Sequence, residues 1–172
     1  MDWPGAFRSR LGAWRYRAAL VLLLELRTPF SGTYWLNVAE CDVPFIGLIE
    51  HTNFVPAERY PAKYLYVSSY LALDDARLRM STDELLRHYL PGLRRISPRF
   101  DERGIQRAWS FREEAAQPIP EIGNRHRLLP YDSPIDGVFI ANTTQIYPED
   151  RGTNCSVRLG REVAAKIAAR RG

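Results

Sequence analysis

Small polar side chains gather where an apolar segment of the sequence meets the start of a predicted helix. The segment Gly137–Asn142 (GVFIAN) is apolar and predicts a buried strand, and helical spacing of apolar residues begins near Thr153. The strand would deliver Asn142 and Thr143 at its carboxyl end. Ligands bind outside the carboxyl ends of strands in open α/β sheets, and a helix N-terminus offers free N–H groups to an anion. The sequence therefore predicts a ligand-facing site here.

The predicted helix itself runs from about Thr153 to Arg170. Apolar and small residues recur along it at helical spacing, and these are Val157, Gly160, Ala164, Ile167 and Ala168. Gly160 and Ala164 form a strip that is poor in side chains. Such a strip suits close packing of helix on strand, and it equally suits the close approach of a flat ligand.

A second group of candidate residues is aromatic and follows a period of two. In Lys63–Leu71, one side of the predicted strand carries Tyr64, Tyr66, Ser68 and Tyr70. Together with Trp35 and Trp109, this side suits either an aromatic wall for a flat or apolar substrate or packing against another domain. His51 and Asn53, in the segment EHTNF, suit either the same cavity or a hydrogen-bonded role at a strand end.

Several other chemistries are not expected. The three histidines stand far apart, and Cys41 and Cys155 show no CxxC spacing, so we predict neither a metal site nor a disulfide framework. No GxSxG motif supports a hydrolytic nucleophile. A thiol at a helix N-terminus, such as Cys155, is either activated by the helix dipole or packed and inert. The cysteine usage favours a reduced, cytoplasmic setting.

Charge and hydropathy exclude two further classes. The formal net charge is +4, from 24 basic and 20 acidic residues, and the arginines stand among acids instead of forming one stripe, so we expect no nucleic-acid binding. The apolar run before Glu25 and Arg27 is far shorter than the roughly 18 residues of a membrane span. We therefore expect no transmembrane segment.

The remaining pattern predicts an α+β fold, with a mixed β-sheet and one inserted helix. A capping box at Ser81 and Glu84 begins that helix, and Pro91-Gly92 is expected to end it. The proline-rich stretch from Gln117 to Pro134 predicts an irregular crossing. The expected strands are Ala18–Arg27, which we predict to be covered on both faces, and Tyr34–Ala39, Pro44–Thr52, Lys63–Leu71 and Ile105–Arg112.

Three segments resemble a known superfamily: ANTTQIYPEDRGTN (141–154), EHTNFVP (50–56) and RAWSFREEAAQPIP (107–120). They closely resemble the C-terminal portion of bacterial FAD-dependent oxidoreductases of the amine oxidase and protoporphyrinogen oxidase-like superfamily. The similarity runs from about Tyr16 to Ala169. It implies that residues 16–131 form a substrate-cap region and that residues 132–172 form a C-terminal strand, loop and helix belonging to an incomplete FAD-binding Rossmann-like domain.

The resemblance also implies roles for single residues. Asn142 and Thr143 stand where many relatives carry Gly-Asp near the flavin ribityl and phosphate, and Asn154, Cys155 and Ser156 fall near the flavin pyrimidine edge. A helix N-terminus suits the negative charge that develops at this edge. The substrate cavity is expected to include His51, Asn53, Tyr66 and Trp109, and no catalytic residue is identified.

The sequence departs from the superfamily in one important respect, because it contains no GxGxxG motif for the ADP half of the cofactor. We therefore expect a C-terminal fragment of an enzyme that transfers a hydride from an amine or related small-molecule substrate to FAD. Alone, this fragment should be inactive and should bind FAD weakly or not at all. The alternative is a non-catalytic cap or assembly module that docks with a separate chain carrying the dinucleotide-binding half.

Overall fold

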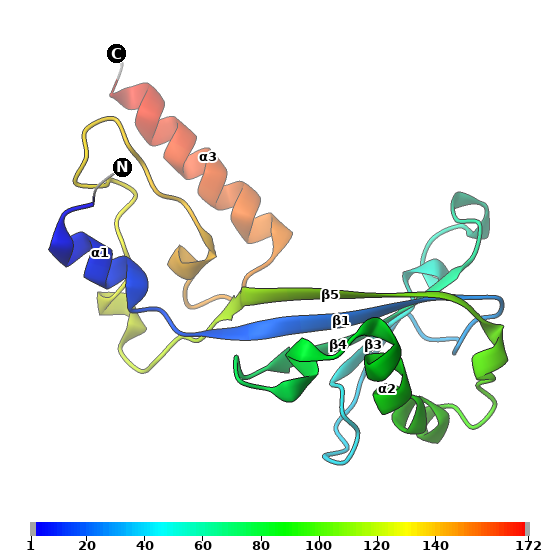
Figure 1. The fold of residues 1–172 in the computed structure, drawn as a ribbon. Coiled ribbons are helices and arrows are strands. Elements are labelled where there is room, and N and C mark those ends of the chain that lie inside the picture. Colours follow the sequence, from blue (N-terminus) through cyan, green and yellow to red (C-terminus); the bar gives the residue numbers. More distant parts are fainter. Residues whose placement is uncertain (1–2, 171–172) are drawn as a thin grey trace. The chain divides into compact units, whose positions relative to one another are not determined.

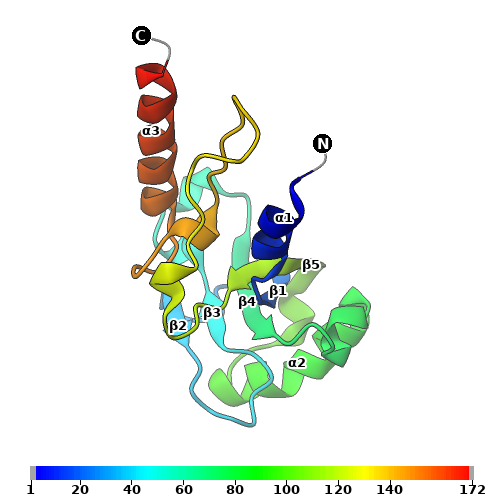
Figure 2. The same ribbon diagram turned by 90° about the vertical axis from the view of Figure 1, so that its left-hand side faces the viewer.

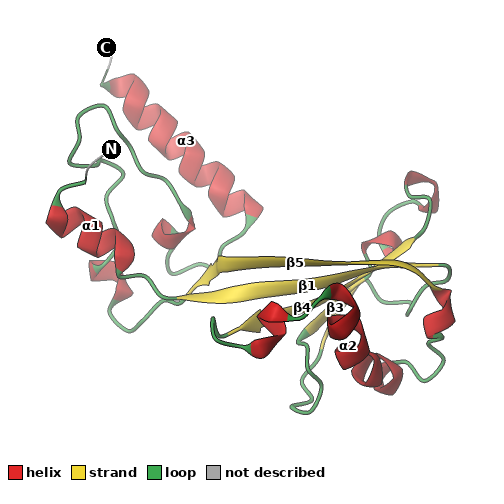
Figure 3. Cartoon of the chain, viewed as in Figure 1, coloured by secondary structure: helices red, strands yellow, loops and turns green. Residues whose placement is uncertain are grey.

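The computed structural model describes residues 3–170, which divide into two compact units. The first, called the sheet unit, spans Tyr16–Gln117. The second, called the terminal unit, combines the residues up to Arg15 with those from Pro118 onward. The strands, yellow in Figure 3, lie in the sheet unit except for Pro118, the last residue of the final strand. The predicted functional boundary at residues 131 and 132 stays a prediction.

The sheet unit is built on five strands: β1 (Tyr16–Leu26), β2 (Trp35–Asn37), β3 (Gly47–Ile49), β4 (Lys63–Leu71) and β5 (Ile105–Pro118). Their order in the sheet is β2-β3-β4-β1-β5 (Figure 1 and Figure 2).

The pairs β1–β4, β3–β4 and β2–β3 are antiparallel. At the two ends of the β1–β5 pair, the Arg27 N–H donates to the Gly104 carbonyl and the Ile119 N–H donates to the Arg15 carbonyl, which also describes antiparallel strands. The predicted mixed sheet is thus wrong. Antiparallel neighbours need only returning loops, whereas parallel ones need long crossovers.

One face of this sheet carries the hydrophobic core. Alternate residues of β1 are fully buried there, and helix α2 (Thr82–Ile96) packs onto the same core (Figure 2). The prediction that β1 is covered on both faces is wrong, because Val21 and Leu23 on its other face are only half-buried. The central members of the core are Leu20, Leu22, Leu24, Leu65, Val67, Leu85, Tyr89 and Leu93.

Helix α2 begins as predicted and ends later than predicted. The capping box is confirmed, since the Ser81 hydroxyl accepts from the Glu84 N–H and the Glu84 carboxylate accepts from the Ser81 N–H. Pro91 lies inside the helix and does not end it. The buried residues Tyr89 and Leu93 hold the helix on the sheet across this position. Gly92 permits the close approach of α2 to Phe45, because a Cβ at this position would lie only 3.0 Å from the Phe45 ring.

Two of the shorter predicted strands shrink in the structure. Tyr34–Ala39 contains only β2, and Pro44–Thr52 contains only β3, after which His51–Asn53 form a 3-10 turn, η1. The prediction for Lys63–Leu71 is confirmed as β4. The strand expected over Ile105–Arg112 is longer than predicted and continues to Pro118.

The terminal unit contains α1 (Gly5–Gly12) and α3 (Thr153–Ala169). The predicted strand Gly137–Asn142 is wrong: Phe139 makes one isolated bridge, to Asp132, and Gly137 has a φ of 73° that suits a turn. An apolar segment needs a neighbouring strand to become part of a ladder, and the described part of this unit provides none. Helix α3 is confirmed, but the buried face is Cys155, Leu159 and Val163, whereas Gly160 and Ala164 are exposed.

Among the described residues, no helix has both the length and the apolar character that a membrane crossing requires.

Candidate functional site

The face of the sheet opposite α2 is rich in aromatic side chains. Trp35 pairs with Ile49, and Ile49 pairs with Tyr66, so these side chains form one row across β2, β3 and β4. Large apolar side chains remain open to solvent, because Trp35 is 55% exposed and Tyr70 is 46% exposed. We call this the aromatic face. It has the composition of a binding surface and not of a sealed core.

A hollow of about 280 Å³ lies on the aromatic face. No charged side chain lines it, and the Ser68 hydroxyl donates to the Gly47 carbonyl at 3.2 Å. Flat, largely uncharged molecules fit such a surface, since it offers ring faces and aliphatic groups but no ion-pair partner. The lining consists of Val21, Trp35, Ile49, His51, Tyr66 and Ser68.

His51 lies in this lining at the centre of a group of tyrosines. Its ring centroid is 4.6 Å from that of Tyr60, 6.0 Å from that of Tyr64 and 5.4 Å from that of Tyr66. Its Nδ1 is buried and has no hydrogen-bond partner among the described residues. Burial raises the pKa of Tyr66, and the nearby Tyr60 and Tyr64 raise it further, so Tyr66 presents a neutral phenol at neutral pH.

A buried carboxylate fixes the segment that carries His51. Glu50 is 1% exposed, and its oxygens accept from the N–H groups of Phe30 and Ser31 and from the Ser31 hydroxyl, each at 2.7 Å. The Asn53 amide donates to the carbonyls of Ser31 and Thr33. These hydrogen bonds tie the loop between β1 and β2 to the η1 turn. They thereby pre-orient Trp35, which follows the loop, and His51, which begins the turn, and both residues line the hollow.

The structure brings together two of the four residues predicted for the substrate cavity. His51 and Tyr66 both line the hollow. Asn53 turns to the β1–β2 loop instead, and Trp109 is half-buried on β5 outside the lining. Sequence reasoning missed Glu50, although its alternation with Leu48 in the strand pattern placed a carboxylate on an apolar side, and a buried acid needs a partner there.

The residues predicted to bind the cofactor lie in the terminal unit. Asn142 acts as an N-cap: its Oδ1 accepts from the Thr144 N–H at 2.9 Å and from the Thr144 hydroxyl at 2.6 Å. Thr143 begins the 3-10 turn η6 (Thr143–Gln145) and is half-buried. The Cys155 thiol is buried and lies 3.7 Å from the Asp150 carbonyl. The Asn142 Oδ1 and the Cys155 thiol are therefore already engaged within the protein.

The start of α3 fits a flavin edge better than those two side chains do. Gly152 is the N-cap and gives no side-chain hydrogen bond to the first turn, and Asn154 and Ser156 are exposed. The open N–H groups of such a turn attract negative charge. A nearby hollow of about 180 Å³ contains Cys155 but also Glu149 and Glu162, so it does not suit an anionic edge. The Arg158 guanidinium, which also lines this hollow, is paired with the carboxylates of Glu149 and Glu162.

Within residues 3–170, no group of histidine, cysteine and acidic side chains is arranged to hold a metal ion.

Comparison with known proteins gives matches at the level of fold. No protein-family model matches the sequence, and no curated protein matches it. The fold is similar to part of a candidate protoporphyrinogen oxidase from Exiguobacterium sp. 255-15, with a TM-score of 0.66 and 11% identity over 92% of this chain. It is also similar to part of an oxidoreductase from Methanosarcina mazei, with a TM-score of 0.64 and 17% identity over 95% of this chain.

A third similar structure is reduced UDP-galactopyranose mutase, with a TM-score of 0.55 and 17% identity over 74% of this chain. The chain spans only 28% to 36% of the length of these three proteins. The matches thus show a fold shared with part of each of these three proteins.

Proposed function

We propose that this chain supplies the substrate-binding sheet and the flavin-contacting C-terminal helix of a FAD-dependent oxidoreductase of the amine oxidase and protoporphyrinogen oxidase-like superfamily. Residues 16–131 would form the substrate side and residues 132–172 the flavin-contacting segment. The observation that carries the proposal is the aromatic face. It holds an uncharged hollow lined by His51 and Tyr66, on a fold shared with part of an oxidoreductase.

The chemistry that a bound flavin would supply is acceptance of a hydride from a C–H bond of the substrate, while the adjacent C–N or C–C single bond loses a proton and becomes a double bond. The protein contributes orientation and a dry surface. Trp35 and Tyr66 would hold a flat substrate, and the neutral Tyr66 adds no charge beside it. Because no carboxylate lines the hollow, an amine substrate would react there in its neutral form.

On the cofactor side, the first turn of α3 would hold the pyrimidine edge. Its main-chain N–H groups, together with the side chains of Asn154 and Ser156, are the donors. Preorganised donors aimed at developing negative charge favour hydride acceptance by a flavin. The ADP half would be bound by polypeptide that carries a GxGxxG motif, which this sequence lacks.

Amide NMR titration of the isotope-labelled 172-residue chain tests this assignment, because it detects weak binding. We expect FMN at millimolar concentration to shift the amides of residues 153–156, and ADP to leave them unchanged. Asn154→Asp adds a carboxylate at this turn and should reduce the FMN shifts. The matched control Gln106→Glu adds the same charge on β5, where Gln106 is exposed, and should not.

Two outcomes would contradict the proposal. Absence of FMN shifts at residues 153–156 would remove the flavin contact and leave the docking module as the better description. Equal shifts with FMN and ADP would show that the turn binds phosphate and not the ring.

A further inference from the structure

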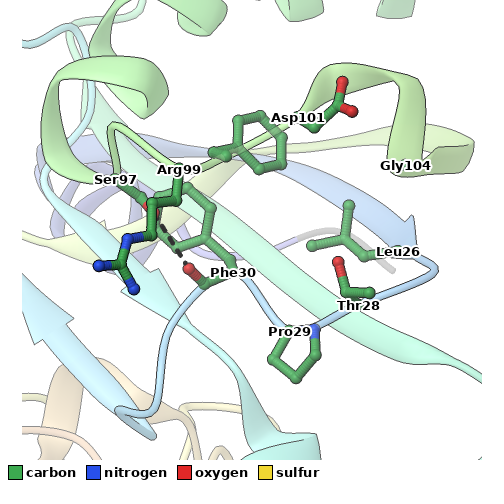
Figure 4. A pocket seen from close by; sticks show the side chains of 9 residues that line it. Leu26, Thr28, Pro29, Phe30, Ser97, Arg99, Asp101 and Gly104 are labelled. Carbon is green, nitrogen blue, oxygen red and sulfur yellow. Dashed lines mark hydrogen bonds between the residues drawn. The ribbon is translucent and has the colours of Figure 1, made fainter.

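A second pocket, of about 250 Å³, lies in the sheet unit where the β1–β2 loop meets the segment that follows α2 (Figure 4). It shares no lining residue with the hollow on the aromatic face. Its lining residues are Leu26, Thr28, Pro29, Phe30, Ser97, Arg99, Phe100, Asp101 and Gly104. Nothing in the proposed oxidoreductase function uses these residues.

The inner part of the pocket is apolar and held in place. Leu26 and Phe30 are buried, and the Phe30 and Phe100 rings meet edge to face with centroids 5.2 Å apart. The Ser97 hydroxyl donates to the Phe30 carbonyl, a bond drawn in Figure 4, and the Phe30 N–H donates to Glu50. An aromatic ring can pack on this surface without first ordering it, which reduces the entropic cost of binding.

Positive charge is in excess around the pocket. The Asp101 carboxylate is engaged, since it accepts from the main-chain N–H and from Nε of Arg103. These bonds lower the pKa of Asp101, and the positive charge of Arg27 lowers it further. Three arginines, Arg27, Arg99 and Arg103, thus stand near Asp101, whereas the neighbouring Glu102 is paired with Arg94 and the Glu50 carboxylate is bound by main-chain N–H groups.

Two donors of the lining have no partner in the described part of the chain. Neither the Arg99 guanidinium nor the Thr28 hydroxyl makes a hydrogen bond or ion pair with any of residues 3–170. In Figure 4 the Arg99 side chain extends beside Phe30, whereas Thr28 lies on the other side of Phe30, next to Leu26, and Asp101 lies on the side of Gly104. A guanidinium can donate two parallel hydrogen bonds to one carboxylate.

We propose that this pocket binds a small aromatic monocarboxylate, with its ring against Phe30 and Phe100 and its carboxylate on the Arg99 guanidinium. An aromatic ammonium ion would meet the excess of arginine charge, so the pocket rejects it. A fully hydrophilic anion such as inorganic phosphate would leave the apolar surface uncovered and would bind more weakly. This site is separate from the proposed flavin function.

Calorimetric titration of the 172-residue chain with benzoate tests the proposal, with benzyl alcohol, benzylamine and inorganic phosphate as comparison ligands. We expect benzoate to bind most tightly. Arg99→Met should weaken benzoate binding by about tenfold or more, because it removes a charge-assisted pair. Arg99→Lys keeps the charge but not the paired donors, so its affinity for benzoate should lie between that of the unchanged chain and that of Arg99→Met.

Arg79→Met is the matched control, since Arg79 is an exposed arginine of the same unit and does not line the pocket. It should leave benzoate affinity unchanged. The proposal is overturned if benzyl alcohol or benzylamine binds as well as benzoate, or if Arg99→Met and Arg79→Met have equal effects. Thermal unfolding of each variant checks that the fold is retained. FMN acts on α3 in the other unit, so failure of benzoate binding and failure of the flavin proposal are read separately.

Discussion

The two faces of the five-stranded sheet use the same strands for different purposes. On the face covered by α2, Leu22 pairs with Val67, and both side chains are fully buried. On the aromatic face, the adjacent Leu23 pairs with Tyr66, and both are half-buried. Successive side chains of a strand point to opposite faces, so one residue step separates a stabilising position from a candidate binding position. The comparison teaches that apolar character alone does not mark the core.

The largest expected effect comes from truncating neighbouring leucines on the two faces. Leu22→Ala should lower the free energy of unfolding by about 3 kcal/mol, because it removes buried methyl groups and leaves a cavity. Leu23→Ala should cost about 1 kcal/mol, since its side chain is only half-buried. Urea unfolding measures both. Equal losses would show that the aromatic face is as well covered as the core.

Glu50 provides the next test, because it belongs to the covered side and yet fixes the loop that leads to the aromatic face. Glu50→Gln removes the charge and one acceptor oxygen from three hydrogen bonds, and should cost about 2 kcal/mol. The exposed Glu114→Gln on β5 is the control and should cost almost nothing. If chemical denaturation gave the two variants the same stability, the buried carboxylate would not hold the loop.

The capping box tests how far the covered face depends on α2. Ser81→Ala removes the acceptor for the Glu84 N–H and should lower stability by about 1 kcal/mol. Ser81→Asp keeps an acceptor at the same place and should restore most of this loss. Circular dichroism during thermal unfolding follows both variants, and a failure of Ser81→Asp to recover stability would contradict the capping role.

The smallest effect is expected at the border of the covered face, where Asp75 pairs with Arg77 at 2.7 Å. Hydrogen bonds from Arg77 lower the pKa of Asp75 to about 2. A carboxyl whose folded pKa lies below its ordinary value of 3.8 stabilises the fold above that value and loses the contribution as pH falls toward 2. The stability advantage of the unchanged chain over Asp75→Asn, under about 1 kcal/mol at pH 7, should shrink below about pH 4 and be mostly lost at pH 2. An advantage of the same size at pH 2 and at pH 7 would exclude this ion pair as its source.

Local patterns predicted the elements that depend on local chemistry. The alternation in Lys63–Leu71 gives β4, and the spacing of Ser81 and Glu84 gives the start of α2. The errors arise where distant residues decide. Pro91 stays helical because Tyr89 and Leu93 pack on the sheet, and Gly137–Asn142 stays irregular because it lacks a neighbouring strand.

The candidate site was predictable to a similar extent. The period-two pattern identified Tyr66 and the aromatic side of its strand, and the segment EHTNF pointed to His51. The direction in which Asn53 turns was not predictable, since it depends on carbonyls of a loop some twenty residues earlier. The Arg99 pocket was missed for the same reason, because its walls come from two segments that only the fold brings together.

The Glu50 carboxylate has a consequence for how this unit can change over time. Phe30, whose N–H donates to Glu50, lines the pocket near Arg99. His51, which follows Glu50 in the sequence, lines the hollow on the aromatic face. Both cavities are recesses of the sheet unit. A substitution that moves the Glu50 carboxylate would therefore reshape both recesses at once, whereas a substitution of a residue that lines only one of them would not.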